Sequence, residues 1–219
     1  MCPVPDPLRI ELAAAAARLI AEEGCDYSQA KRRALQVVLG VEGAARGALP
    51  DNAEIEHELR RHLSVFAADT HPALLRGLRR AALGVMSQLA EFSPHLVGAV
   101  LNGTATEHSD IEVHLFTDSA KDVEVFLMNA GIDFDADSGD IRERPAAQER
   151  LTFVIDAREA GLPSSLRRIG VRLHVFERDA IRVAPRHRAV ASAEFALHPV
   201  AAGGRASLAA LRQLIDESP

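Results

Sequence analysis

Two acidic side chains in the middle of the chain have the spacing of a metal-binding pair. Asp110 and Glu112 open an alternating run, and residues two apart in a β-strand point to the same face. Two carboxylates that project together suit a divalent ion, because Mg²⁺ in proteins is held by one or two carboxylates and by substrate phosphates. The pair therefore predicts a magnesium site for a nucleoside triphosphate, against the simpler alternative of a solvated strand face.

A turn of small residues precedes the acid pair. Gly103 and Thr104 follow the apolar run Leu96–Leu101. Gly103 would let a phosphate approach the backbone, and the hydroxyl or amide of Thr104 would bind a phosphate oxygen. Ser109 and Asn102 flank the same turn and are further candidates for phosphate binding. The structural alternatives are that the glycine only serves a tight turn and that Ser109 only starts a strand.

This segment resembles the signature of the nucleotidyltransferase superfamily, which includes DNA polymerase beta and the minimal nucleotidyltransferases. The signature is an apolar strand, a Gly-Ser or Gly-Thr pair, a short loop, and then acid-apolar-acid-apolar on the next strand. Asp110-Ile111-Glu112-Val113 supplies the last part, and the resemblance covers roughly residues 94 to 178. Two features depart from the pattern: Thr104 lies only six positions before Asp110, and the second acid is Glu rather than the commoner Asp.

The resemblance implies a fold, a reaction and a cofactor. The fold would be α+β, with a small mixed β-sheet of nucleotidyltransferase type packed with helices in residues 94–219 and an N-terminal helical region in residues 1–93. The reaction would move a nucleotidyl group from an NTP to an unknown acceptor hydroxyl. Asp110 and Glu112 would be catalytic and would hold Mg²⁺, which stabilises charge on the attacking and leaving oxygens.

Active members of the superfamily usually carry a third carboxylate on a later strand beside the first two. Alternation within residues 171–176 places Arg172 and His174 on one face, and the expected position falls on His174. A histidine can act as a base, although a lone strand histidine is more often structural. Asp156 is the best acidic substitute and Glu177 the next. The missing acid favours an alternative function, a catalytically degenerate nucleotidyltransferase fold that binds a nucleotide, RNA or protein partner.

Other histidines lie near the motif but do not predict a transition-metal site. His114 shares the predicted face of Asp110 and Glu112, and His108 lies in the preceding loop. Three alternate strand positions spread over about 13 Å from end to end, because each residue rises about 3.3 Å. Asp110, Glu112 and His114 are therefore not expected to ligate one ion.

Composition limits the possible partners and compartment. A net charge of −6 argues against coating of nucleic acid by bulk electrostatics, but it leaves room for a local basic patch such as Lys31-Arg32-Arg33. Cys2 and Cys25 lack metal-ligand spacing and are expected to be reduced. The N-terminus lacks signal-peptide features, and the Ala-rich run 12–21 is too short to span a bilayer. We therefore expect a cytoplasmic protein, whose oligomeric state stays open.

A second resemblance is weaker. Residues 15–24 look like the opening helix of TetR-type repressors, and another helix is predicted after them. Residues 40–50 are rich in Gly and Ala and do not provide the recognition helix that such a regulator needs. A helix-turn-helix regulator is therefore the third choice of function.

Periodicity and turn residues predict helices first and strands later. The N-terminal half reads as four helices, the second capped by Ser28, and the C-terminal half alternates strands with helices. An Asp-rich loop or hairpin is expected near residues 133–140, a helical turn near 163–165, and no clear period over 180–204. The predicted helices are 8–23, 29–39, 51–67, 72–89, 119–130 and 207–216, and the predicted strands are 96–101, 111–115, 151–155 and 171–176.

Overall fold

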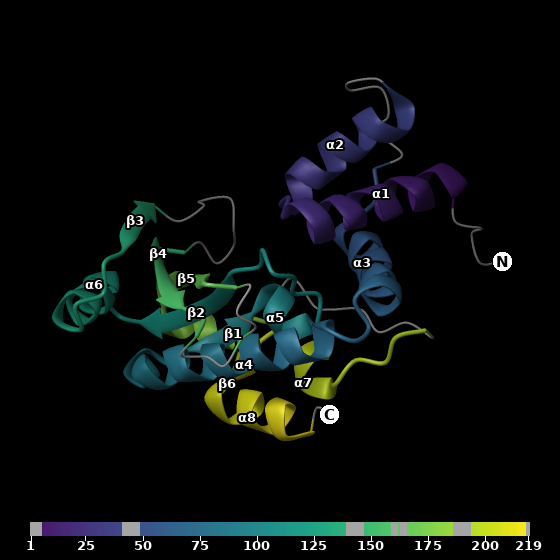
Figure 1. Ribbon diagram of the computed structural model, residues 1–219. Helices are drawn as coiled ribbons and strands as arrows, with labels where there is room; N and C mark the ends of the chain where they lie inside the picture. Colours follow the sequence, from purple (N-terminus) through teal and green to yellow (C-terminus); the bar gives the residue numbers. More distant parts are fainter. Residues whose placement is uncertain are drawn as a thin grey trace. The chain divides into compact units, whose positions relative to one another are not determined.

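The computed structural model describes residues 6–40, 49–138, 147–158, 162, 166–185 and 194–217 (Figure 1). The chain forms two compact units. The first comprises residues 1–72 with 106–108 and 190–196, and the second comprises residues 73–105, 109–189 and 197–219. Helix α4 (His71–Gln88) belongs to the second unit from Ala73 onward, whereas the sequence analysis grouped it with the N-terminal helices.

The first unit is built from helices α1 (Pro7–Glu23), α2 (Tyr27–Leu39) and α3 (Asn52–Phe66). The predicted ends of the first two helices at Gly24 and Gly40 are confirmed, with φ values of 67° and 65° that glycine adopts without a steric penalty. The predicted cap at Ser28 is wrong. Asp26 accepts the N–H of Gln29 and caps α2 two residues earlier.

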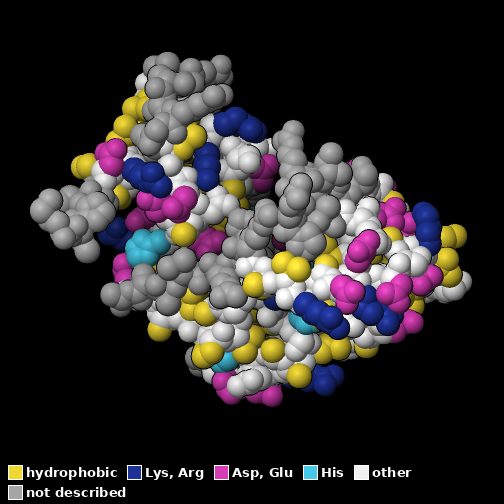
Figure 2. Space-filling view, turned by 180° about the vertical axis from the view of Figure 1, so that it is seen from behind, with side chains coloured by type: hydrophobic (Ala, Val, Ile, Leu, Met, Phe, Trp, Pro, Cys, Tyr) yellow, Lys and Arg dark blue, Asp and Glu magenta, His cyan; other side chains and the backbone are white. Residues whose placement is uncertain are grey.

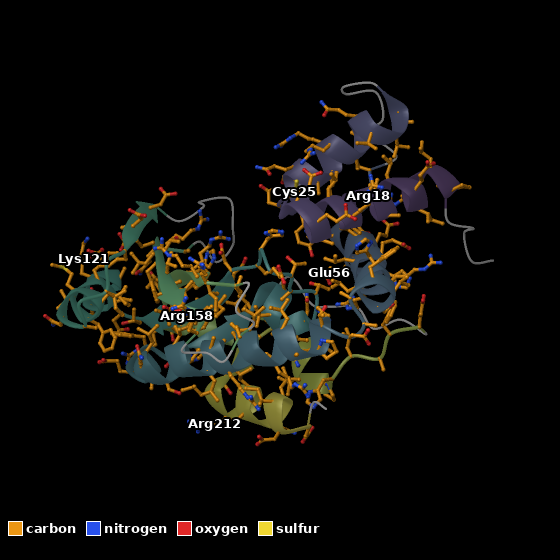
Figure 3. The ribbon with its side chains drawn as sticks, in the orientation of Figure 1. Arg18, Cys25, Glu56, Lys121, Arg158 and Arg212 are labelled. Atoms are coloured by element: carbon orange, nitrogen blue, oxygen red, sulfur yellow. The ribbon has the colours of Figure 1, made fainter. Side chains whose placement is uncertain are left out.

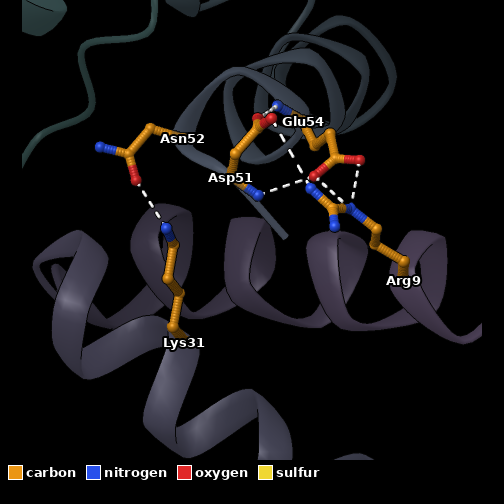
Figure 4. Close-up of polar contacts among 5 residues, drawn as sticks. All are labelled: Arg9, Lys31, Asp51, Asn52 and Glu54. Carbon is orange, nitrogen blue, oxygen red and sulfur yellow. Dashed lines mark hydrogen bonds and ion pairs between the residues drawn. The ribbon is translucent and has the colours of Figure 1, made fainter. Parts of the chain in front are cut away.

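A polar network joins the three helices of this unit (Figure 4). Arg9 donates from Nε to both carboxylate oxygens of Glu54, at 2.6 and 2.8 Å. Asp51 and Glu54 form a capping box at the start of α3. Lys31 donates from Nζ to Oδ1 of Asn52 at 2.7 Å, and partial burial lowers the pKa of Lys31. Lys31, which belongs to the predicted local basic patch, therefore has a structural partner.

The second unit contains a six-stranded mixed sheet in the order β3-β4-β5-β2-β1-β6. Strand β2 pairs in parallel with β5, and the other neighbouring pairs are antiparallel. The fold is thus mixed α/β, as the order of predicted elements indicated. The strands are β1 (His95–Val97), β2 (Ile111–Thr117), β3 (Asp135–Ser138), β4 (Glu149–Asp156), β5 (Arg168–Glu177) and β6 (Ala206–Ser207).

One face of this sheet packs on helices to form the main hydrophobic core. Alternate residues such as Val113 and Leu173 are fully buried there together with Leu78, Leu127 and Leu211 from three helices. Figure 1 shows these helices beside the sheet. The remaining helical elements are η1 (Ala90–Phe92), α5 (Gly98–Asn102), α6 (Ala120–Asn129), η2 (Arg178–Arg182), α7 (Pro199–Ala202) and α8 (Leu208–Glu217).

The predicted strand over residues 96–101 is wrong in its second half. Strand β1 ends at Val97, and Gly98 adopts a φ of 69°, which breaks the extended conformation. The chain then turns into α5, whose Val100 and Leu101 are buried. An apolar run of six residues satisfies either conformation, and burial of these two side chains is compatible with a short helix.

Three other segments complete the comparison with the predicted elements. The Asp-rich segment contains the edge strand β3, and the region without a clear period contains η2 and α7. The predicted turn at 163–165 lies outside the described residues.

Among the helices that the structure describes, none combines the length and apolar character that crossing a membrane requires.

Candidate functional site

The acid pair lies at the start of β2 and projects toward one neighbour on β5. Glu112 is directly opposite Arg172 in the parallel register. Arg172 donates from Nη2 to Oδ2 of Asp110 at 2.6 Å, and its Nη1 lies 3.4 Å from Oε1 of Glu112. The two carboxylates therefore share one face, as alternation predicted, and they share one guanidinium. All three side chains are about one-third exposed.

Two glycines leave the space that the carboxylates occupy. Gly98 follows β1, and a Cβ added there would lie 2.9 Å from Oε2 of Glu112. Gly170 lies on β5, and a Cβ added there would overlap Oδ1 of Asp110. Neither position tolerates a side chain without displacement of an acid. The absence of a Cβ at both glycines therefore leaves room for both carboxylates beside the backbone.

The turn at Gly103 and Thr104 has a structural geometry. Gly103 adopts a φ of 86° after α5. Thr104 is 1% exposed, and both its N–H and its hydroxyl donate to Oδ1 of Asn102, at 3.0 and 2.7 Å. Ser109 is half-buried immediately before Asp110. Because the donors of Thr104 are already used inside the protein, this geometry favours the role of a tight turn for the Gly-Thr pair.

Arg79 of α4 positions the segment between β1 and β2. Its side chain is buried and donates to the main-chain carbonyls of Val100 and Leu101, both at 3.2 Å. These carbonyls belong to the last turn of α5, where a cation is favourable. Burial lowers the pKa of Arg79 to about 10, so the guanidinium stays charged at neutral pH. The helix that leads from Gly98 to the turn is therefore held from its C-terminal end.

The two acids predicted as substitutes for a third carboxylate lie elsewhere on the sheet. Asp156 lies on β4, opposite Arg168 of β5. Strand β4 does not neighbour β2, which carries Glu112. The carboxylate of Asp156 accepts the N–H of Arg158 at 2.8 Å. Arg158 follows β4 and is labelled in Figure 3. Glu177 is opposite Thr117 at the far end of β2. The residue of β5 opposite Glu112 is a cation, not an acid.

His174, the other candidate for the third position, lies one alternation step beyond Arg172. It is opposite His114, with ring centroids 5.5 Å apart. Burial, with smaller contributions from Arg150 and Arg172, lowers the pKa of His174 to about 4. Burial also lowers the pKa of His114 to about 3, with smaller contributions from His174, Arg205 and His95. Both rings are neutral at pH 7.

These histidines lie among aromatic rings rather than in an open site. His114 packs on Phe176 at 4.7 Å between ring centroids, and Phe176 stacks on Phe116 at 5.7 Å. His174 is 9% exposed, and its Nδ1 has no hydrogen-bond partner within the described part of the chain. A base must reach the proton that it abstracts. The burial of His174 therefore favours the structural role.

The remaining candidate ligands do not gather at the acid pair. His108 belongs to the first unit, where its Cβ would lie 2.7 Å from a Cβ added to Gly24. In the basic run of α2, Arg33 pairs with Glu23, with 2.5 Å between Nη1 and Oε2. Over the described residues, no group of three or more His, Cys, Asp or Glu side chains is arranged to hold a metal ion.

The residues at the acid pair do not fit the predicted Mg²⁺ site as they stand. Mg²⁺ needs free carboxylate oxygens in near-octahedral geometry. Arg172 instead occupies an oxygen of Asp110 and lies against Glu112. A divalent ion would have to displace this guanidinium and would meet its positive charge. The arrangement is an ion-paired triad of Asp110, Glu112 and Arg172.

The sequence predicted Asp110 and Glu112, but it did not identify Arg172 as their partner or Gly98 and Gly170 as the glycines beside them. Gly98 lies twelve positions before Asp110 and directly ends the first strand, which is a signal that the Gly103-Thr104 pair obscured. Arg172 shared a face with His174, but the register between β2 and β5 decides which of them meets Glu112. Comparison of the chain with protein-family models, curated proteins and solved structures found no match to any of them.

Proposed function

We propose that this chain is a catalytically degenerate nucleotidyltransferase-like protein that binds a protein partner. The observation that carries the proposal is the pairing of Arg172 with both Asp110 and Glu112. In an active member, a carboxylate is expected beside the acid pair. Here a guanidinium holds that position, so the protein itself offsets part of the negative charge that metal ions would otherwise offset.

The position of Gly98 supports the resemblance to nucleotidyltransferases. The residue after it supports the loss of nucleotidyl transfer. With Gly98-Ala99 in the role of the Gly-Ser pair, the loop before Asp110 has the greater length that is usual in the superfamily. The hydroxyl of that pair is then absent, because residue 99 is alanine. The short loop noted for Thr104 no longer counts against the resemblance. The missing hydroxyl and the missing third acid both count against nucleotidyl transfer.

Charge favours a protein partner over a nucleotide or RNA. The triad of two carboxylates and one guanidinium keeps one net negative charge, which repels phosphates in the absence of a metal. On the face of the second unit shown in Figure 2, Lys and Arg side chains stand among Asp and Glu side chains. The net charge of −6 adds to this argument, because nucleic-acid binding depends mainly on positive charge.

The first experiment is thermal unfolding of the full chain with each of the four NTPs, with and without Mg²⁺. A ligand that binds only the native state stabilises it by about 2.7 kcal/mol at a hundredfold excess over Kd. We expect no Mg²⁺-dependent shift and no pyrophosphate release. A shift that requires Mg²⁺, or release of pyrophosphate, would contradict the proposal and favour the Mg²⁺-dependent transferase.

A variant tests whether Arg172 is what prevents Asp110 and Glu112 from binding a divalent ion. Arg172→Ala frees both carboxylates, and we expect it to gain stabilisation by Mn²⁺ or Mg²⁺ that the natural chain lacks. Arg168→Ala is the matched control, because Arg168 is on the same strand and exposed but lies opposite Asp156. Gain of divalent-ion stabilisation in both variants would show that the effect is not specific to the triad.

A further inference from the structure

A cavity of about 870 Å³ opens at the edge of the sheet, away from the acid pair. It is bounded by α4, by residues 131–135 and by the last residues of β4. Its size lies in the range of ligand-binding clefts. All of its lining belongs to the second unit, and the ion-paired triad does not contribute to it.

The cavity follows a stretch of strand edge that no strand of the described residues covers. Strand β3 pairs with β4 only over residues 149–152, whereas β5 pairs with β4 along its whole length. Within the described residues, no strand covers the outer edge of β4 from Phe153 to Asp156. An uncovered edge presents free N–H and C=O groups, which an added strand can pair with. From the first to the last, these four residues span about 10 Å.

Small residues of α4 line the side of the cavity that faces this strand edge. Ala81 and Gly84 line the cavity, and a Cβ added to Gly84 would meet no atom within 4 Å. Val85, Phe134 and Phe153 also line the cavity. Val154, which is 46% exposed, lines it too, but its side chain belongs to the opposite face of β4 from the buried Phe153. An extended chain at the edge of β4 would thus place alternate apolar side chains in this hollow.

The two ends of the cavity carry opposite charge. Leu162, which follows β4, packs on Gly77, so the N-terminal part of α4 lies at the C-terminal end of β4. Arg80 and Arg168 are at that end, and both are exposed without an ion pair in the described part of the chain.

The opposite end is acidic. Residue 135 is opposite Thr152 in the β3–β4 pairing, which places Asp135 and its neighbour Asp133 at the start of the uncovered edge. Both aspartates are exposed. At the basic end, the carboxylate of Asp156 is already bonded to the N–H of Arg158. The cavity therefore has an acidic end and a basic end, about four residues of β-strand apart.

The geometry points to the binding of an extended peptide segment of a partner protein, added as a strand to the edge of β4. Complementarity assigns its chemistry: a basic residue near Asp133 and Asp135, apolar residues facing Gly84, and an acidic residue near Arg80 and Arg168. This inference gives the protein partner of the proposed function a recognition site. It does not depend on the state of Asp110, Glu112 and Arg172.

The test measures binding of two fluorescein-labelled peptides to the full chain by fluorescence anisotropy. One peptide has the sequence Lys-Val-Thr-Val-Glu, and the other has the same residues in reverse order. We expect one of the two orders to bind, and a peptide with Glu at both ends to bind more weakly. Gly84→Leu fills the hollow from a helical position with open space around it. We expect it to weaken binding at least about tenfold, with an unfolding midpoint no lower than that of the natural chain.

Charge reversal gives a second readout. Arg80→Glu should weaken binding of the Glu-bearing peptide about threefold, and a peptide with Lys in place of that Glu should recover it. Lys121→Ala on α6 is the control outside the cavity. Failure of both peptides to bind, or equal binding to Gly84→Leu, would overturn the inference. A dimer of the natural chain that Gly84→Leu abolishes would also overturn it, because a second copy would then occupy the edge.

Discussion

Two groups of side chains on one face of the sheet differ in burial and in charge. Asp110, Glu112 and Arg172 are charged, about one-third exposed and paired with one another. One alternation step along the same strands, His114 and His174 are more deeply buried and neutral. The charged group keeps its charges because each has a partner, whereas the histidines lose theirs because burial favours the uncharged ring.

This difference gives the two groups different sensitivities. The triad depends on complementary charges and on the space at two glycines, so substitution is expected to affect it most. The histidine pair depends on staying neutral, so acid is expected to affect it most. The predictions below separate these sensitivities, beginning with the largest expected effect.

Acidification should destabilise the second unit through the histidines. The pKa values of His114 and His174 are about 3 and 4 in the folded protein and near 6.5 in the unfolded chain. Between these values the unfolded chain binds more protons, so stability is fully retained above pH 6.5 and is lost as the pH falls. The loss from pH 7 to pH 5 should be about 3 kcal/mol in urea titrations.

The control for this effect is a chain without the two ionisable rings. His114→Phe with His174→Phe should keep the aromatic packing and should flatten the pH dependence between pH 7 and pH 5. Arg150, Arg172, Arg205 and His95 also act on these rings, and they remain in the variant. A variant that loses stability as steeply as the natural chain would show that other groups carry the effect.

Substitution of Gly170 should disturb the triad through space alone. The Cβ of Gly170→Ala would overlap the carboxylate of Asp110, which would have to turn away from Arg172, and we expect a loss of about 1 to 2 kcal/mol in chemical denaturation. Gly84→Ala is the matched control, since its Cβ meets no atom within 4 Å and the position is helical. It should stabilise by about 0.5 to 1 kcal/mol. Equal effects at the two positions would contradict the close approach at Asp110.

The ion pair between Arg172 and Asp110 should contribute a smaller amount. Both side chains are about one-third exposed, so solvent screening limits their interaction. A double-mutant cycle with Arg172→Ala and Asp110→Ala should give a coupling free energy of about 1 kcal/mol, lower at high salt. Zero coupling at low salt would mean that the two side chains do not interact in solution.

The exposed pair on α6 should contribute least. Lys121 lies 2.7 Å from Glu124, but it projects from the helix into solvent (Figure 3). Lys121→Ala should leave the midpoint of thermal unfolding unchanged within error. A clear drop would show that exposed pairs matter in this protein, and the contrast between surface charges and the partly buried triad would then be lost.

Local sequence determined much of the architecture. Glycines ended helices where predicted at Gly24 and Gly40, because each adopts a positive φ that other residues avoid. Alternating apolar residues also placed β2, β4 and β5 correctly, since period two is a property of the strand itself. The shared face of Asp110 and Glu112 follows from the same periodicity.

Only the tertiary structure decided which side chains meet. The parallel register between β2 and β5 puts Arg172, and not His174, opposite Glu112, and sixty positions of sequence separate that pair. The local pattern around each residue carries no information on this register. The same is true of the cavity, which exists because β3 covers only half of β4. Periodicity specifies the face of a side chain, whereas pairing between distant strands specifies its neighbours.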